Sequence, residues 1–248
     1  MKKRVLCLIK IFDNEAYADA FINHGEMFCR TLTGFKNIDD EVFRGDRFEG
    51  VTDWFQSKNV SMNVSYKDNH GVKYSFPVDD LVGPVVLQSS HLSRLNAYCM
   101  YAMISPEYCE SYETEQERVH AINKINKLLN DNVSLSDEVI KLGGFAVVVY
   151  RVGDFILKVK NMSDASGFSM WNGLVNYYNP DSFHGSFDGI KAVFNKRSIY
   201  EHQSEYRFVF DIKQNANDKL FSIGSLNGLA FKIPTNRIND ALKLEVQR

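Results

Sequence analysis

The sequence has little cysteine and no excess of positive charge, and both shortages argue against whole classes of protein. Its 248 residues include four cysteines, which form no C-x-x-C pair and have no spacing suited to zinc. We therefore expect reduced, mostly buried cysteines in a cytoplasmic protein. The formal net charge is −2, so no global positive field attracts nucleic acid or an anionic membrane, and both are disfavoured as partners.

The chain also lacks long apolar runs and linkers. An apolar run at residues 5–9 ends at Lys10 and is too short for a signal peptide or a membrane span, so we predict a buried first strand and no membrane association. No repeat, low-complexity tract or linker rich in proline, glycine and serine divides the sequence. This predicts one domain over residues 1–248.

Motifs that define a catalytic class on their own are missing. The sequence has no G-x-x-x-x-G-K-[ST], no G-x-G-x-x-G after a strand, no H-E-x-x-H and no G-x-S-x-G. Its six histidines are scattered without metal-ligand spacing. We therefore expect neither a P-loop enzyme nor a bound metal.

Aromatic residues are abundant, with 18 phenylalanines and 12 tyrosines, and they favour sheet-rich structure. Residues 13–22 begin with capping residues and early acids, which predicts an N-terminal helix, and residues 114–129 repeat apolar side chains at helical spacing. We predict an α+β fold with a mainly antiparallel β-sheet core, an N-terminal helix and a longer helix near 113–130. Strands are expected at 26–32, 97–105 and 145–150, and a hairpin at 60–76.

Two further segments have less definite patterns. Residues 155–159 fit either a returning strand or a helix. Residues 220–224 and 229–234 flank the turn sequence of residues 225–228, which predicts a second hairpin, followed by a short closing helix from Thr235.

The segment 205–212 alternates aromatic and polar residues as a strand does, with its apolar side chains at every second position. Gln203, Glu205 and Arg207 then share the opposite face. Two interpretations are open. These residues line a cleft, or they form the ordinary solvated face of a half-buried sheet in which Glu205 and Arg207 are an ion pair.

A second segment, residues 35–50, is dense in charge and is closed by two glycines. It can hold an anionic ligand through Arg44 or Arg47 while neighbouring acids fix the guanidinium. It fits equally well a surface turn whose own charges pair with one another.

The tripeptide of residues 203–205 resembles the Gln/Glu-x-Glu signature of ADP-ribosyltransferases. The resemblance implies NAD as cofactor. It implies that Glu205 is catalytic, holds the 2′-hydroxyl of the nicotinamide ribose and favours the oxocarbenium-like transition state. Gln203, two residues earlier, would orient the acceptor nucleophile. A fixed carboxylate beside a sugar that develops positive charge lowers the barrier.

The same resemblance assigns cofactor-binding residues. The family has an early Arg or His for the dinucleotide and a Ser or Thr on a middle strand that supports the sugar. Arg30, or Arg44, and Ser105 come in the corresponding chain order. Tyr200 belongs to the same late motif, and we assign it to cofactor binding with them.

The wider pattern is similar to a group of bacterial and phage domains of unknown function, across residues 20–212. This implies a toxin or a phage–host conflict factor that modifies a macromolecular acceptor. The matching positions are residues 28–35, Asp46, Glu49, Cys99, residues 144–145, Lys196, Tyr200 and residues 203–207.

The alternative is a protein-binding module on the same fold without catalysis. It would bind a protein partner through the charged turn and through the aromatic segment near Trp171. The binding residues would be Asp46, Glu49 and Arg207. Nucleic-acid binding is the least supported function because the basic residues are dispersed.

Overall fold

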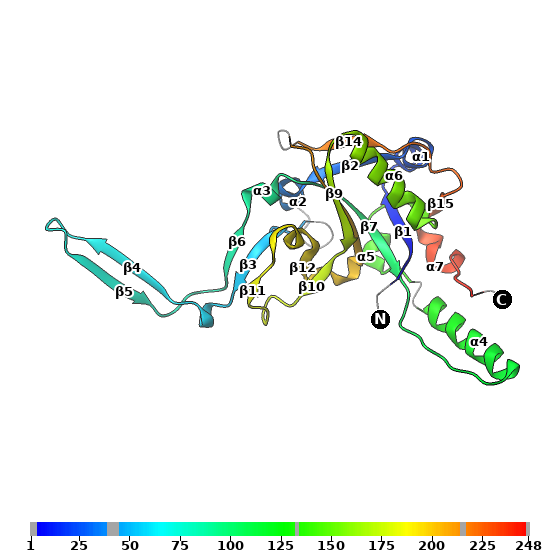
Figure 1. Cartoon of the computed structure of the whole chain (residues 1–248), viewed down its shortest axis with the longest axis horizontal. Coiled ribbons are helices and arrows are strands. Elements are labelled where there is room, and N and C mark those ends of the chain that lie inside the picture. The colour runs from blue at the N-terminus through cyan, green and yellow to red at the C-terminus, as the bar shows by residue number, and fades with distance from the viewer. Residues whose placement is uncertain (1–3, 39–44, 132–133, 214–216, 247–248) are drawn as a thin grey trace.

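The computed structural model describes residues 4–38, 45–131, 134–213 and 217–246, and its fold is α+β, dominated by antiparallel sheet (Figure 1). The predicted fold class is confirmed. Strand β7 (Asn96–Ile104) is central, as its nearly unbroken apolar sequence predicts. One of its edges pairs with β13 (Glu205–Asp211), which in turn pairs with β9 (Ser169–Leu174).

Two strands share the other edge of β7, so the sheet divides there. β1 (Val5–Phe12) pairs with the end of β7, and β2 (Glu26–Thr31) pairs with its beginning at residues 96–97. The β1 branch continues through β8 (Phe145–Val149) and β15 (Ala230–Pro234), and the β2 branch continues through β14 (Lys219–Ser222). At this fork, Lys10 Nζ donates a hydrogen bond of 2.8 Å to the carbonyl oxygen of Cys99.

Helix α1 (Glu15–His24) connects the two branches. The Asn14 side chain caps it by accepting from the Ala16 amide at 2.9 Å, and Gly25 ends it with φ of 64°. Ala18 and Phe21 are wholly buried on its inner side. The predicted N-terminal helix is confirmed, and so is the longer one, α4 (Glu115–Asp131).

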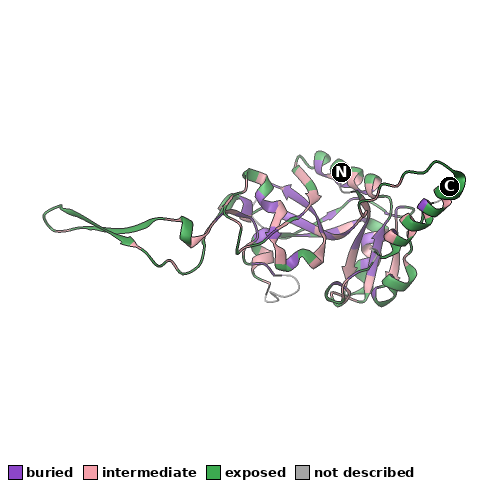
Figure 2. Ribbon diagram, turned by 90° about the horizontal axis from the view of Figure 1, so that it is seen from below, coloured by how far each residue is buried: buried purple, intermediate pink, exposed green. Residues whose placement is uncertain are grey.

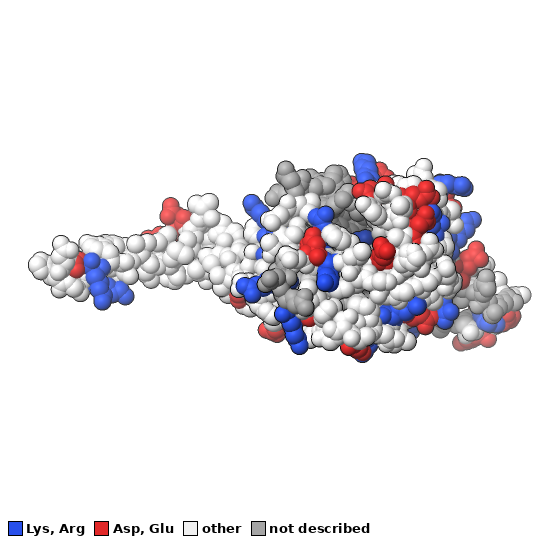
Figure 3. Space-filling model, turned by 90° about the horizontal axis from the view of Figure 1, so that it is seen from above, with Lys and Arg blue, Asp and Glu red and all other residues white. Residues whose placement is uncertain are grey.

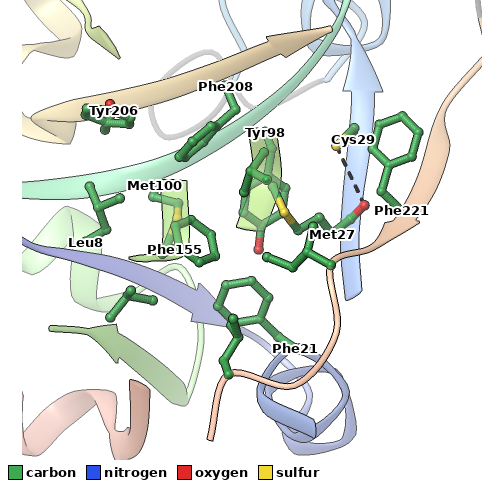
Figure 4. Close-up of a cluster of buried hydrophobic side chains, with 14 of the residues drawn as sticks. Leu8, Phe21, Met27, Cys29, Tyr98, Met100, Phe155, Tyr206, Phe208 and Phe221 are labelled. Carbon is green, nitrogen blue, oxygen red and sulfur yellow. Dashed lines mark hydrogen bonds between the residues drawn. The ribbon is translucent and has the colours of Figure 1, made fainter. Parts of the chain in front are cut away.

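The main core lies on one face of the sheet, beneath α1 and α6 (Val152–Ala165). Figure 4 shows Leu8, Phe155 and Phe208 converging there from a strand, a helix and a second strand. The alternating aromatics of β13 point into this core, as predicted. The segment 155–159 is helical, because its apolar residues are spaced to bury Phe155 and Val159 on one side of α6.

The prediction of a hairpin at residues 220–234 is wrong. β14 and β15 belong to opposite branches of the fork, so they pair with β2 and β8 and not with each other. The intervening turn packs inward instead, with Leu226 fully buried and its amide donating to the Ile22 carbonyl at 2.7 Å. The closing helix consists of two short pieces, η4 (Thr235–Arg237) and α7 (Ile238–Ala241).

The remaining elements surround the sheet or project from it. The hairpin predicted at 60–76 is confirmed as β4 and β5. The elements that surround the sheet or project from it are α2 (Leu32–Lys36), β3 (Val51–Phe55), η1 (Ser57–Asn59), β4 (Met62–Lys67), β5 (Lys73–Val78), β6 (Val85–Gln88), α3 (Ser90–Ser93), α5 (Asp137–Ile140), β10 (Asn176–Tyr178), β11 (Gly185–Ser186), η2 (Gly189–Phe194), β12 (Asn195–Arg197) and η3 (Ser198–Gln203).

We expect Gly25→Ala to destabilise the fold by about 1–3 kcal/mol. A Cβ at this left-handed position would lie 2.4 Å from the Gly224 carbonyl oxygen and 2.5 Å from Ile223 Cγ1. Gly153→Ala in α6 is the matched control, because a Cβ there meets nothing within 4 Å, and we expect no loss of stability from it. Urea unfolding of both variants measures the difference, and equal stabilities would contradict the close packing at the end of α1.

Candidate functional site

Four charged side chains form a closed cluster beneath the surface. Arg207 donates through its two terminal nitrogens to Glu49, at 2.8 and 3.0 Å, and through Nε to Glu205 at 2.5 Å. Lys196 Nζ lies 3.2 Å from a carboxylate oxygen of Glu49 and of Glu205. All four side chains are at most 5% exposed. The cluster is electrically balanced, with two carboxylates and two cations.

Separate parts of the chain supply this cluster. Glu205 and Arg207 share one face of β13, as their spacing predicts, and Lys196 comes from β12. Glu49 comes from the turn before β3. Of the two interpretations of the face of residues 203–207, the ordinary one correctly predicts the ion pair of Glu205 and Arg207. It is wrong about the solvated face, because these two residues are 4% and 1% exposed.

Gln203 is not on the strand with Glu205. It ends η3, and Ser204 follows with φ of 37°, which turns the chain before β13 begins. The Ser204 hydroxyl donates to the Ala102 carbonyl at 2.7 Å and fixes this bend. Gln203 still reaches the cluster, because its Oε1 accepts from Lys196 Nζ at 2.8 Å.

The charged turn before β3 is held down by residues from η3 and β12. Arg197 donates to Asp46 at 2.8 Å, and the Tyr200 hydroxyl donates to the Gly45 carbonyl at 2.7 Å. Burial and the neighbouring Glu49 raise the pKa of Asp46. Of the two interpretations of this segment, the self-paired surface turn is wrong for Asp46 and Glu49, since each is 1% exposed and pairs with a distant residue.

This burial also corrects the partner-binding assignment. Asp46, Glu49 and Arg207 are buried and engaged inside the protein, so their side chains do not face a protein partner. Arg44, predicted as the alternative to Arg30 for binding the dinucleotide, lies outside the described residues.

The cluster fixes the protonation states of its members. Burial alone would raise the pKa values of Glu205 and Glu49, but attraction by Arg207 and Lys196 outweighs it and lowers both. Burial would lower the pKa of Lys196, and the two carboxylates raise it instead. Burial and nearby Glu205 raise the pKa of the Cys99 thiol to about 12. At neutral pH, Glu205 is therefore a carboxylate, Lys196 an ammonium and Cys99 a thiol.

A cavity of about 760 Å³ opens beside the cluster and extends to the fork of the sheet. The cluster and Gln203 line one part of it. Its other walls combine apolar and aromatic side chains with Arg30, which lies on β2 beside Phe28 at 6.0 Å from ring centroid to guanidinium carbon. The lining residues that these walls contribute include Ile9, Phe28, Arg30, Phe35, Cys99 and Tyr101.

The cavity brings together three of the residues predicted for ADP-ribosyl transfer, Arg30, Gln203 and Glu205. It does not bring Ser105 to them. Ser105 follows the end of β7 and is not one of the residues that line the cavity. Its hydroxyl donates to the Pro106 carbonyl. Tyr200 is fully buried against the charged turn and does not line the cavity, so its assignment to cofactor contact is not supported.

Two residues of the site, Lys196 and Tyr101, have no predicted role in catalysis or binding. Lys196 is one of the matching positions of the wider pattern, but no local signal indicates that it pairs with Glu49 and Glu205. Tyr101 could have been found from the alternation of β7, which places it on the same face as Cys99.

No protein-family model, curated protein or solved structure matches this chain. The similarity to ADP-ribosyltransferases therefore depends on the quoted residues alone. Within the described residues, no helix is long and apolar enough to cross a membrane, and no group of three or more histidine, cysteine or acidic side chains is placed to hold a metal ion.

We expect Glu49→Gln to lower the free energy of unfolding by about 3–5 kcal/mol, because it leaves a buried cation without its counter-charge. Glu15→Gln is the matched control. Glu15 forms an ion pair with Lys232 at 2.8 Å but is 57% exposed, so its loss costs less than about 1 kcal/mol. Chemical denaturation at pH 7 measures both, and similar losses would show that the cluster contributes no more than a surface pair.

The lowered pKa values of Glu49 and Glu205 predict sensitivity to acid. Their contribution to stability is complete above the ordinary glutamate pKa of about 4.3 and is lost as the pH falls through the lower folded-state values. Denaturation between pH 7 and pH 3 should therefore show falling stability. The fall should be smaller for Glu49→Gln, which has one carboxylate fewer to protonate, and equal slopes would contradict the assignment.

Proposed function

We propose that the cavity binds NAD and that the protein transfers ADP-ribose from it to a macromolecular acceptor. The observation that supports this function is the convergence of Arg30, Gln203 and Glu205 on one cavity. These residues come from an early strand, a late turn and the following strand, and the resemblance had assigned them the dinucleotide, the acceptor and the catalytic acid.

Glu205 has the properties that the reaction needs. The C1′–N bond to nicotinamide breaks, nicotinamide leaves with the electron pair, and positive charge develops on the ribose. A carboxylate that is ionised and immobile stabilises this charge without reorganising. Arg207 and Lys196 hold Glu205 in that state. A carboxylate has about four acceptor positions, and Arg207, Lys196 and Cys99 occupy three, so one remains for the ribose 2′-hydroxyl.

Gln203 and Arg30 take the other two roles. The Gln203 amide lies beside the cluster and orients the acceptor nucleophile, which forms a bond to C1′ and releases its proton to solvent. Arg30 is exposed on β2, and its guanidinium can donate two parallel hydrogen bonds to a pyrophosphate. The aromatic walls of the cavity suit the flat rings of the dinucleotide.

We place this reaction in the cytoplasm, in a toxin or a phage–host conflict factor. All four cysteines are free, which suits a reducing compartment. On the face seen in Figure 3, basic and acidic side chains are interspersed, so a protein acceptor is favoured over nucleic acid. The alternative of a protein-binding module is less favoured, because Asp46, Glu49 and Arg207 are buried, although the aromatic segment near Trp171 is only partly buried.

To test this function, the purified protein is incubated with labelled NAD and a cell lysate. Nicotinamide release and transfer of the label to lysate components are then measured. We expect Glu205→Gln to reduce turnover by about 10²–10³-fold, and Arg30→Ala to raise KM for NAD by roughly tenfold with little effect on kcat.

Glu49→Gln is the matched control for Glu205→Gln. It weakens the same buried cluster but keeps the Glu205 carboxylate, so it should retain far more activity at a temperature where both variants are folded. Equal losses would make the effect structural. If the parent protein neither binds NAD in calorimetry nor releases nicotinamide, the proposed function is wrong.

A further inference from the structure

A hairpin arm projects from the body of the protein. It consists of β4 and β5, residues 62–78, which pair with each other and, within the described part of the chain, with no other strand (Figure 1). Every residue of β4 is exposed, and so are all residues of β5 except Val78, which is half-buried. Figure 2 shows the arm extending as an exposed ribbon away from the buried core.

The two faces of the arm differ completely in chemistry. Strict alternation in both strands puts three apolar cross-strand pairs on one face and the polar pairs, including both lysines, on the other. We call the first of these the apolar arm face. Its pairs are Met62 with Val78, Val64 with Phe76 and Tyr66 with Tyr74, and the opposite pairs are Asn63 with Pro77, Ser65 with Ser75 and Lys67 with Lys73.

The apolar face of such an arm is stabilised only by a surface that shields it from water. A two-stranded hairpin alone is at best marginally stable in water, and an apolar face gains stability only when something excludes water from it. The rings of Tyr66 and Tyr74 stack at 5.0 Å between centroids, which aligns them but still leaves them 54% and 40% exposed. Within the described residues, no other element packs on this face.

We propose that the apolar arm face packs against the same face of a second copy of this chain. At the turn end of the arm, the Asp68 carboxylate accepts from the Tyr74 hydroxyl at 3.4 Å. The six residues of the apolar arm face are themselves uncharged, and Lys67 and Lys73 lie on the opposite face, so an anionic partner would meet that opposite face. The complement of the apolar arm face must itself be flat, apolar and uncharged, and the same face of another copy has these properties. Because the arm extends beyond the body, two arms can lie together with the bodies at opposite ends.

The available area fits a weak, specific dimer. Three aromatic rings that are 40–54% exposed, with their aliphatic neighbours, leave on the order of 500 Å² of apolar surface per arm. Two copies then bury on the order of 1,000 Å², the lower end of specific interfaces. Two-fold symmetry makes the contact isologous, and the central pair of Val64 and Phe76 lies nearest the axis.

Sedimentation velocity over roughly 1–100 µM protein tests the proposal. We expect the mass to rise from 28.4 kDa to twice that value, with a micromolar Kd. Val64→Lys should raise Kd at least tenfold, because it buries a charge in the interface. Ser65→Lys adds the same charge to the opposite face and should leave Kd unchanged. A monomer at every concentration, or a dimer indifferent to Val64→Lys, would overturn the proposal.

Cross-linking gives a second measurement that does not depend on the stability of a variant. In a Cys109→Ser background, which removes the exposed native thiol, Val64→Cys should be joined to its counterpart by a short bismaleimide. Asn63→Cys, one residue away on the polar face, should not. The reverse result would show that the copies meet through another surface.

Discussion

The buried guanidinium of Arg207 imposes the main constraint on this structure. A cation with 1% exposure is tolerated only if all of its lost hydration is replaced. Here Glu49, Glu205 and the Val193 carbonyl replace it. Glu49 is 158 positions away in sequence, so β13, the segment before it and the turn before β3 have to assemble together. A partly formed cluster would be worse than none, because each unpaired charge keeps its desolvation penalty.

The same constraint shapes the cavity. With two carboxylates balanced by two cations, the cluster attracts no ligand through net charge. Other polar groups that line the same cavity are the Gln203 amide, which contacts the cluster, and the Arg30 guanidinium on another wall. The cavity lies at the fork of the sheet, because β1 and β2, which pair with different ends of β7, both contribute lining residues. The ion cluster therefore lies beside this fork.

Much of the fold could be predicted from local periodicity, and much of the site could not. Alternation identified β13 and the inward direction of its aromatics, and helical spacing identified α4. The turn at 225–228 has hairpin chemistry, but the pairing of its flanking strands is set by the distant fork. Period-2 geometry placed Glu205 and Arg207 together without revealing that Glu49 and Lys196 cover them. Burial of charges depends on partners remote in sequence, which no local pattern encodes.

The arm follows the same alternation rule as β13 and differs only in what covers it. In β13 the apolar side chains at alternate positions meet α6 and α1 in the core. In the arm the alternation is equally strict, yet the apolar side faces solvent. A solvated hairpin has no physical need for an apolar face, since polar residues would hold the same strand pairing at lower cost to solubility. The pattern is therefore accounted for by a covering surface that the described part of the chain does not supply, and the proposed second copy would supply one of matching shape and chemistry.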